Sequence, residues 1–178
     1  MNLLNELMNA AGSGDLQKLG NQFGLDESAV SNVMKQVVPA LGQGLKTNAT
    51  SPGGLESLIA ALQNGNHGRY VEDISAATGS AGIAEGNNIL GHILGSKDAS
   101  RAVASQASSA SGVSPDVIKQ MLPMLATIVM GALNKKTDGG AQLQAASDNP
   151  LGGLAGMLDM DGDGSAMDDV MDIAKKFF

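Results

Sequence analysis

Residues 114–133, SPDVIKQMLPMLATIVMGAL, hold the longest apolar stretch of the chain and decide its fold. Ser114 followed by Pro115 is typical of a helix start, because serine caps the first turn and proline needs no N–H there. Apolar residues cover nearly the whole circumference of the helix that follows, so we expect it to be central and buried. Its apolar part is about 13 residues long and is interrupted by a proline and a threonine. A membrane-spanning helix needs about 18 or more apolar residues, so we expect no membrane partner.

Helical periodicity also dominates outside this stretch, and the alternation typical of strands is absent. Further helices are expected over residues 3–8, 13–24, 26–39, 51–65, 70–77, 83–94, 97–110 and 151–158. Pro39 should end or kink its helix. Ser51 and Pro52 should open the next helix, and Gly65 should stop it. The sequence therefore predicts an all-α protein, a multihelical bundle.

The chain contains an internal repeat. Residues 35–41, KQVVPAL, match residues 119–125, KQMLPML, and the turn at 24–26, GLD, matches the turn at 112–114, GVS. The two offsets are 84 and 88 positions, so the first copy has about one extra helical turn before its proline. The expected divisions are a first helical repeat (1–65), a second repeat packed with it as one domain (66–136), a linker (137–150) and a divalent-ion-binding helix-loop-helix (151–178).

The chain resembles the YidB-like bacterial proteins, a family of unknown function, and the resemblance is most specific in its second half. The resemblance covers about residues 20–178 and rests on GHILG at 91–95, the 112–114 turn, the 119–125 helix, MGAL at 130–133, and DGDGS at 161–165 with Asp168 and Asp169. It implies an all-helical fold of two duplicated, homeodomain-like units. It implies no activity.

The segment from Arg101 to Ile118 has the spacing of a helix-turn-helix, which many DNA-binding proteins use. The exposed positions of its second helix hold one cation and one anion: Ser114, Pro115, Asp116, Lys119 and Gln120. The matching positions of the first repeat hold two anions and no cation: Asp26, Glu27, Ser28, Ser31 and Asn32. Phosphate contacts supply most non-specific affinity for DNA, and the chain has a net charge of −7. We therefore expect a packing motif and no nucleic acid partner, and a helix-turn-helix DNA-binding regulator is the alternative.

An acidic segment near the C-terminus has the spacing of the first half of an EF-hand loop, in which oxygen ligands converge on Ca²⁺. The candidate ligands are Asp159, Asp161, Asp163, Ser165 through its carbonyl, Asp168 and Asp169. Position 12 of such a loop is Val170 rather than glutamate, so the loop would be abbreviated, as in dockerin-like proteins. Zn²⁺ is not expected, because the chain has no cysteine and no histidine nearby. The alternative is a solvated acidic cap on the final helix.

The remaining polar residues show no catalytic spacing. We expect His67 to be solvated in a polar linker and His92 to have a structural role on an apolar helix. Glycines 82, 86, 91 and 95 are spaced so that helix backbones could approach closely. No serine, histidine and acidic residue have the spacing of a catalytic triad. No glycine-rich stretch ends in the lysine and serine or threonine of a phosphate-binding loop.

These observations predict a non-enzymatic, cytoplasmic protein with an interaction or self-assembling structural role. The aliphatic composition and the low charged fraction of 16% favour a homo-oligomer or a protein partner. The expected ion is structural Ca²⁺, which would fix the angle of the last helix.

Overall fold

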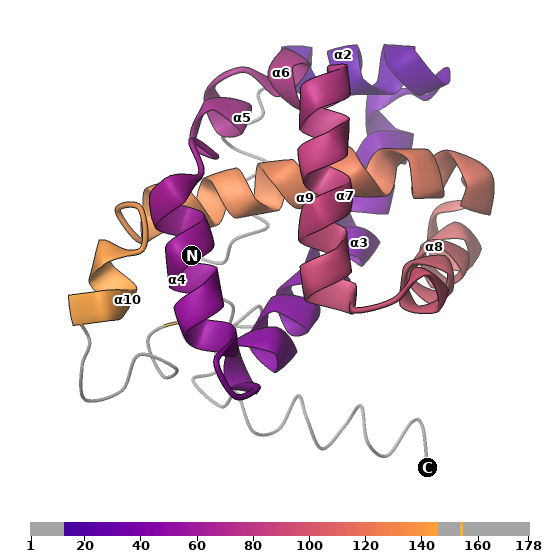
Figure 1. Cartoon of the computed structure of the whole chain (residues 1–178). Helices are drawn as coiled ribbons and strands as arrows, with labels where there is room; N and C mark the ends of the chain where they lie inside the picture. Colours follow the sequence, from indigo (N-terminus) through magenta and orange to yellow (C-terminus); the bar gives the residue numbers. More distant parts are fainter. Residues whose placement is uncertain (1–12, 146–153, 155–178) are drawn as a thin grey trace, which may run out of the picture.

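The computed structural model describes residues 13–145 and Leu154, and this part of the chain contains helices and no strands (Figure 1). The helices are α2 (Ser13–Phe23), α3 (Glu27–Thr50), α4 (Gly54–Asn64), α5 (Arg69–Glu72), α6 (Ile74–Thr78), α7 (Ser80–Leu94), α8 (Lys97–Ser111), α9 (Pro115–Lys136) and α10 (Ala141–Ala145). The predicted all-α class is confirmed.

Helix α9 is the central element. The Ser114 side chain caps it by accepting a hydrogen bond from the Val117 N–H, and every residue from Met121 to Leu133 is buried. Figure 1 shows α9 running across the molecule behind α7, with α8 at one end and α10 at the other. The predicted central, buried helix is therefore confirmed.

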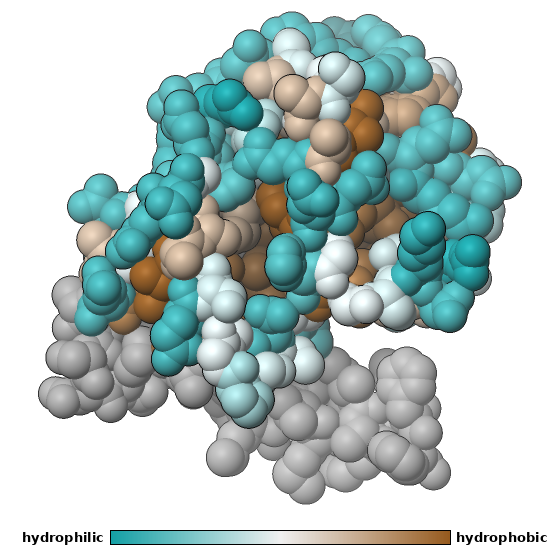
Figure 2. Space-filling view, viewed as in Figure 1, coloured by the Kyte–Doolittle hydropathy of each residue, from teal (hydrophilic) through white to brown (hydrophobic). Residues whose placement is uncertain are grey.

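Among the helices described above, only α9 is long and apolar enough to cross a membrane, judged by length and composition. However, 78% of its most apolar window is buried inside the protein. Burial of this kind is typical of a core helix whose apolar surface is covered by its neighbours. In the space-filling view, hydrophilic residues cover most of the visible face, and hydrophobic residues show mainly in the hollows between helices (Figure 2).

Two helix boundaries near Ser51 differ from the sequence prediction. Helix α3 continues through Pro39 to Thr50, because the residues beyond the proline, Leu41 and Leu45, are buried in the core. Ser51 therefore ends α3 instead of opening α4, whose N-cap is Gly53 in the left-handed conformation. Gly65 ends α4 as predicted.

The expected helix over residues 70–77 is two short helices, which meet at Asp73. The Asp73 side chain accepts a hydrogen bond from the Ser75 N–H and so caps α6. Asparagine, aspartate and serine favour such caps over helix interiors, because their side chains compete for backbone N–H groups. The chain therefore changes direction between α5 and α6.

The two turns that the repeat predicted have the same local geometry. Gly24 and Gly112 both adopt left-handed conformations, with φ of 67° and 76°. Each turn leads into a long helix whose N-cap side chain, Asp26 or Ser114, accepts a hydrogen bond from the N–H three residues on. Each of these helices also contains its matching proline, Pro39 or Pro123.

Of the four spaced glycines, Gly82 and Gly86 are buried and Gly91 and Gly95 are exposed. A Cβ at Gly86 would collide with the backbone carbonyl of Pro123, and one at Gly82 would collide with the backbone of α6. A Cβ at Gly91 or Gly95 would meet nothing within 4 Å. The predicted close approach is therefore confirmed for the first two glycines and wrong for the last two.

Candidate functional site

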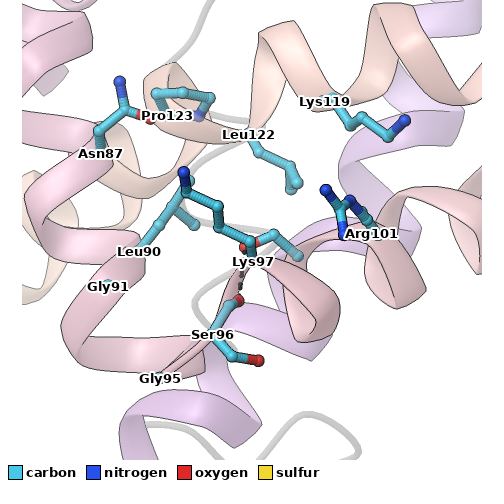
Figure 3. Close-up of a pocket in the computed structure, with 11 residues that line it drawn as sticks. Asn87, Leu90, Gly91, Gly95, Ser96, Lys97, Arg101, Lys119, Leu122 and Pro123 are labelled. Carbon is cyan, nitrogen blue, oxygen red and sulfur yellow. Dashed lines mark hydrogen bonds between the residues drawn. The ribbon is translucent and has the colours of Figure 1, made fainter.

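A pocket of about 640 Å³ lies between the end of α7, the start of α8 and the first half of α9 (Figure 3). Its apolar lining comes from Leu90, Leu122 and Pro123, and its cations are Lys97, Arg101 and Lys119. The volume falls within the range of about 300–1,000 Å³ that is typical of ligand pockets. No acidic residue lines it.

The local sequence explains why this pocket is open. Gly95 ends α7 in the left-handed conformation, and Ser96 immediately caps α8 by accepting a hydrogen bond from the Ala99 N–H, 3.1 Å away. The short connection holds the end of α7 next to the start of α8. Gly91 and Gly95 line the pocket and have no side chain to fill it.

The charge of the pocket is positive. Lys97 makes no ion pair with any residue in the described ranges, whereas Arg101 pairs with Asp98 at 2.7 Å and Lys119 with Asp116 at 3.0 Å. Both pairs are within one helix and exposed, and such pairs contribute only about 0–1 kcal/mol. The positive end of the α8 dipole adds to the field. Arg101 and Lys119 can therefore exchange their partners for an anionic ligand at small cost.

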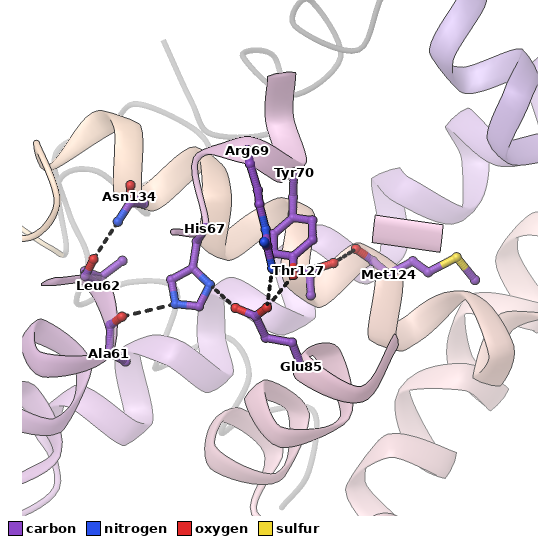
Figure 4. Close-up of polar contacts among 9 residues, drawn as sticks. All are labelled: Ala61, Leu62, His67, Arg69, Tyr70, Glu85, Met124, Thr127 and Asn134. Carbon is purple, nitrogen blue, oxygen red and sulfur yellow. Dashed lines mark hydrogen bonds and ion pairs between the residues drawn. The ribbon is translucent and has the colours of Figure 1, made fainter. Parts of the chain in front are cut away.

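A second polar cluster joins α5 to α7, and in it His67 and Tyr70 are buried, Glu85 is half-buried and Arg69 is exposed (Figure 4). The Tyr70 hydroxyl donates a hydrogen bond to Glu85, and the Arg69 guanidinium donates to the Tyr70 oxygen at 2.6 Å and lies over the Tyr70 ring. His67 Nδ1 makes an ion-pair contact of 2.6 Å with Glu85 but without hydrogen-bond geometry. Its Nε2 lies 3.1 Å from the Ala61 carbonyl.

His67 is only 6% exposed, so the prediction of a solvated histidine was wrong. The polar residues around it are a linker in sequence, but Gly65 and Gly131 leave room for the segment against α9. A Cβ at Gly65 would overlap the His67 ring, and one at Gly131 would lie 2.5 Å from the His67 carbonyl oxygen. The cluster therefore holds the segment between α4 and α6 against α7 and α9. The side chains of the cluster interact mainly with one another, through hydrogen bonds and ion pairs.

Tyr70 provides a spectroscopic test of this cluster, since it is the one tyrosine in a chain without tryptophan. Burial first, and then the hydrogen bond with Glu85, raise the pKa of Tyr70 above its ordinary value. The folded chain thus binds the phenolic proton more tightly than the unfolded chain. The stability that this adds is fully present below about pH 10 and is lost as the pH rises through the folded-state pKa.

We expect the tyrosinate absorbance of the native protein to titrate above pH 10, and that of the urea-unfolded protein to titrate near pH 10. Glu85→Gln should lower the native midpoint part of the way, because burial remains. Equal midpoints for the native and unfolded protein would contradict the buried position of Tyr70.

The predicted calcium ligands, Asp159, Asp161, Asp163, Ser165, Asp168 and Asp169, lie outside the described residues. Within the part that is described, no group of three or more metal-ligating side chains comes together. The His92 side chain is exposed, and its carbonyl accepts a hydrogen bond of 2.8 Å from Asn48, which joins α7 to α3. The predicted exposed positions of the α8–α9 motif, Ser114, Pro115, Asp116, Lys119 and Gln120, are exposed.

The sequence analysis did not find the pocket. Lys97 and Arg101 belong to an alanine- and serine-rich helix, and Lys119 follows 18 positions after Arg101. A signal was present in the spacing of Lys97 and Arg101, which are four residues apart and so lie on one helix face. Only the packing of α8 against α7 and α9 shows that this face meets Lys119.

Comparison with known proteins identifies a family and no individual relative. No curated protein and no solved structure matches the chain. The family of bacterial proteins of unknown function named DUF937 matches residues 5–136, which include α2 to α9 and the whole pocket lining. Since this match covers well over half of the 178 residues, the chain belongs to the DUF937 family of bacterial proteins of unknown function.

Proposed function

We propose that this protein is a non-enzymatic, cytoplasmic interaction protein whose pocket binds acidic, partly apolar segments of proteins. The observation that carries the proposal is the convergence of Lys97, Arg101 and Lys119 around a lining that has no acid. Leu90 and Leu122 lie at the floor of the pocket and are only 7% and 1% exposed, so the apolar surface beside the charges comes mainly from the methylene stems of the three cations. A peptide that alternates carboxylates with aliphatic side chains would satisfy both parts of the pocket.

The buried polar cluster supports a structural role better than a catalytic one. Tyr70, Glu85 and Arg69 bond to one another, and both ring nitrogens of His67 face protein oxygens. A general base needs a free nitrogen within reach of its substrate. The proposal therefore assigns this cluster to holding α5 against α7.

Fluorescence anisotropy with an acidic peptide tests the proposed function. The peptide LDMDGDGSAMDDVMD, labelled at its N-terminus, is titrated with the full-length protein at low salt, and a second peptide has asparagine in place of each aspartate. We expect saturable binding of the acidic peptide at or below millimolar protein, weakened by added salt. Equal binding of the two peptides, or no binding even to a variant whose own six aspartates at residues 159–172 are asparagine, would refute it.

The helix-turn-helix alternative is less well supported. The chain has a net charge of −7, which opposes a phosphate backbone. The Asp116 carboxylate would face a phosphate backbone at the exposed start of α9. Tight, salt-sensitive binding of duplex DNA at low salt would favour this alternative over the peptide-binding proposal.

We also propose the finer plan that the sequence suggested: a YidB-like protein with two duplicated, homeodomain-like repeats. The left-handed glycines and capped helices at Gly24 and Gly112 support the duplication. We further propose that the protein associates with copies of itself. Light scattering at micromolar concentration tests it, and a mass of 18.0 kDa alone would contradict it.

Structural Ca²⁺ at the acidic segment stays a prediction from the sequence. Calorimetric titration of the chelator-treated full-length protein should show saturable Ca²⁺ uptake, because clustered carboxylates repel one another without a cation. Asp161→Ala or Asp163→Ala should remove this uptake and leave the repeats folded. Glu56→Gln, at an exposed position on α4, is the control that should leave it unchanged. Absence of uptake at millimolar Ca²⁺ would contradict the calcium site and favour the alternative, a solvated acidic cap on the final helix.

A further inference from the structure

We propose that, in the calcium-free protein, the ligand of the pocket is this chain's own acidic segment, residues 158–172, folded back onto the molecule that carries it. The inference rests on the proposed function, because it names the partner of the same pocket. Docking in this way would make the pocket autoinhibited, so that an acidic segment of another protein would have to displace the chain's own.

The composition of the segment complements the pocket. Residues 158–172 contain six aspartates and no lysine or arginine, whereas the pocket is lined by three cations and no acid. Leu158 and Met160 alternate with Asp159 and Asp161 along the chain. A segment of this kind offers carboxylates to the cations and aliphatic side chains to the methylene stems of Lys97, Arg101 and Lys119 (Figure 3).

Three cations line this pocket, and its lining contains no acid. Lys18 on α2 pairs with Asp15, and Lys135 at the end of α9 pairs with Glu72. Lys119 has a counterpart in the first repeat, Lys35, but Lys35 does not line the pocket. Charge complementarity therefore favours the pocket between α7, α8 and α9.

The length of the chain permits this docking. Leu154 is buried in the core cluster, so it fixes the start of the segment to the body of the protein. An extended chain advances about 3.3 Å per residue, so Asp159 can lie up to about 17 Å from Leu154, and Asp172 up to about 60 Å. A compact body of this size has a radius of gyration of about 14 Å, hence a diameter below about 40 Å. The segment can thus reach the pocket wherever Leu154 lies.

Attachment also favours the chain's own segment over a free one. A tethered ligand has an effective concentration in the millimolar range, which exceeds the concentration of a second copy in a dilute sample. A weak pocket with a dissociation constant near 100 µM would still be mostly occupied. The proposal therefore predicts a docked segment in the monomer.

Paramagnetic relaxation in solution locates the segment directly. The chain has no cysteine, so Ser165→Cys creates a single attachment site for a nitroxide and keeps all six aspartates. In the full-length, 15N-labelled protein, we expect strong broadening of the amide signals of Gly95, Ser96 and Arg101. The signal of Lys35 should keep its intensity. Broadening that spares the pocket, or none, would overturn the inference.

Two further samples identify the source of the broadening. Lys97→Glu with Arg101→Glu in the labelled protein should abolish it, because the cations are reversed. A mixture of nitroxide-labelled 14N protein with unlabelled 15N protein should show none. Broadening in the mixture would mean that the segment docks on a second copy, which overturns docking within one chain.

Peptide binding separates this inference from the proposed function. When all six aspartates of the segment are changed to asparagine in the full-length chain, the labelled acidic peptide should bind at least tenfold more tightly than to the wild type. Lys97→Glu with Arg101→Glu should cancel this gain in affinity. A gain that came only from the lower negative charge of the variant would not depend on these two cations. Equal binding to wild type and asparagine variant would overturn the inference alone. No binding to either protein would overturn the proposed function.

Discussion

Replacing Gly86 by valine is expected to destabilise the protein by about 3 kcal/mol or more. Gly86 is buried in α7, and an added Cβ would collide with the Cα, carbonyl carbon and oxygen of Pro123 in α9. These are backbone atoms of the central helix, so they cannot rotate aside as a flexible side chain would. Overpacking of a core commonly costs about 1–3 kcal/mol, and a rigid neighbour increases the cost. Urea denaturation followed by circular dichroism measures the loss.

Gly91→Ala is the matched control in the same helix. An added Cβ at Gly91 meets nothing within 4 Å, and alanine is a better helix former than glycine by about 1 kcal/mol. We expect the free energy of unfolding to stay the same or to rise by up to about 1 kcal/mol. Similar losses in both variants would contradict the close contact between α7 and α9.

Reversing the charge of the pocket with Lys97→Glu and Arg101→Glu should weaken binding of the acidic peptide at least tenfold. A tenfold change in affinity is about 1.4 kcal/mol, which is modest for two charge-assisted contacts turned into repulsions. The stability of the fold should change little, because both side chains are exposed. Fluorescence anisotropy at low salt gives the affinity, and circular dichroism checks that the helices are retained.

Lys35 supplies a matched control for this double variant. Lys35→Glu makes the same kind of charge change at the position that corresponds to Lys119, on an exposed side of α3 and outside the pocket. We expect Lys35→Glu to change the affinity for the peptide less than twofold. If Lys35→Glu weakened binding as much as Lys97→Glu alone, the peptide would be responding to net charge rather than to the pocket.

Local signals in the sequence predicted much of the fold. The Ser114–Pro115 start, the left-handed Gly112 turn and the burial of residues 121–133 all follow from caps, glycine and apolar periodicity, which act within a few residues. Helix α3 does not end at Pro39, because packing of the following leucines outweighs the backbone hydrogen bond that a proline lacks. Tertiary packing of this kind leaves little trace in a local pattern.

The candidate site could not be predicted in the same way. The pocket depends on three helices that meet, and its openness depends on Gly91 and Gly95, whose spacing in the sequence indicated close packing instead. His67 was misplaced for a related reason, since its burial depends on Glu85, Ala61 and the glycines that surround it. Each of these features joins residues that are far apart in the sequence, so no local sequence motif predicts it.

Chemical-shift mapping with the acidic peptide tests the central claim most directly. The peptide LDMDGDGSAMDDVMD is added to the full-length 15N-labelled protein whose six aspartates at residues 159–172 are asparagine. The account predicts saturable shifts at Gly91, Gly95, Lys97, Arg101 and Lys119, which line the pocket, and none at Lys35. Shifts that are absent, or that centre on residues away from α7, α8 and α9, would contradict it.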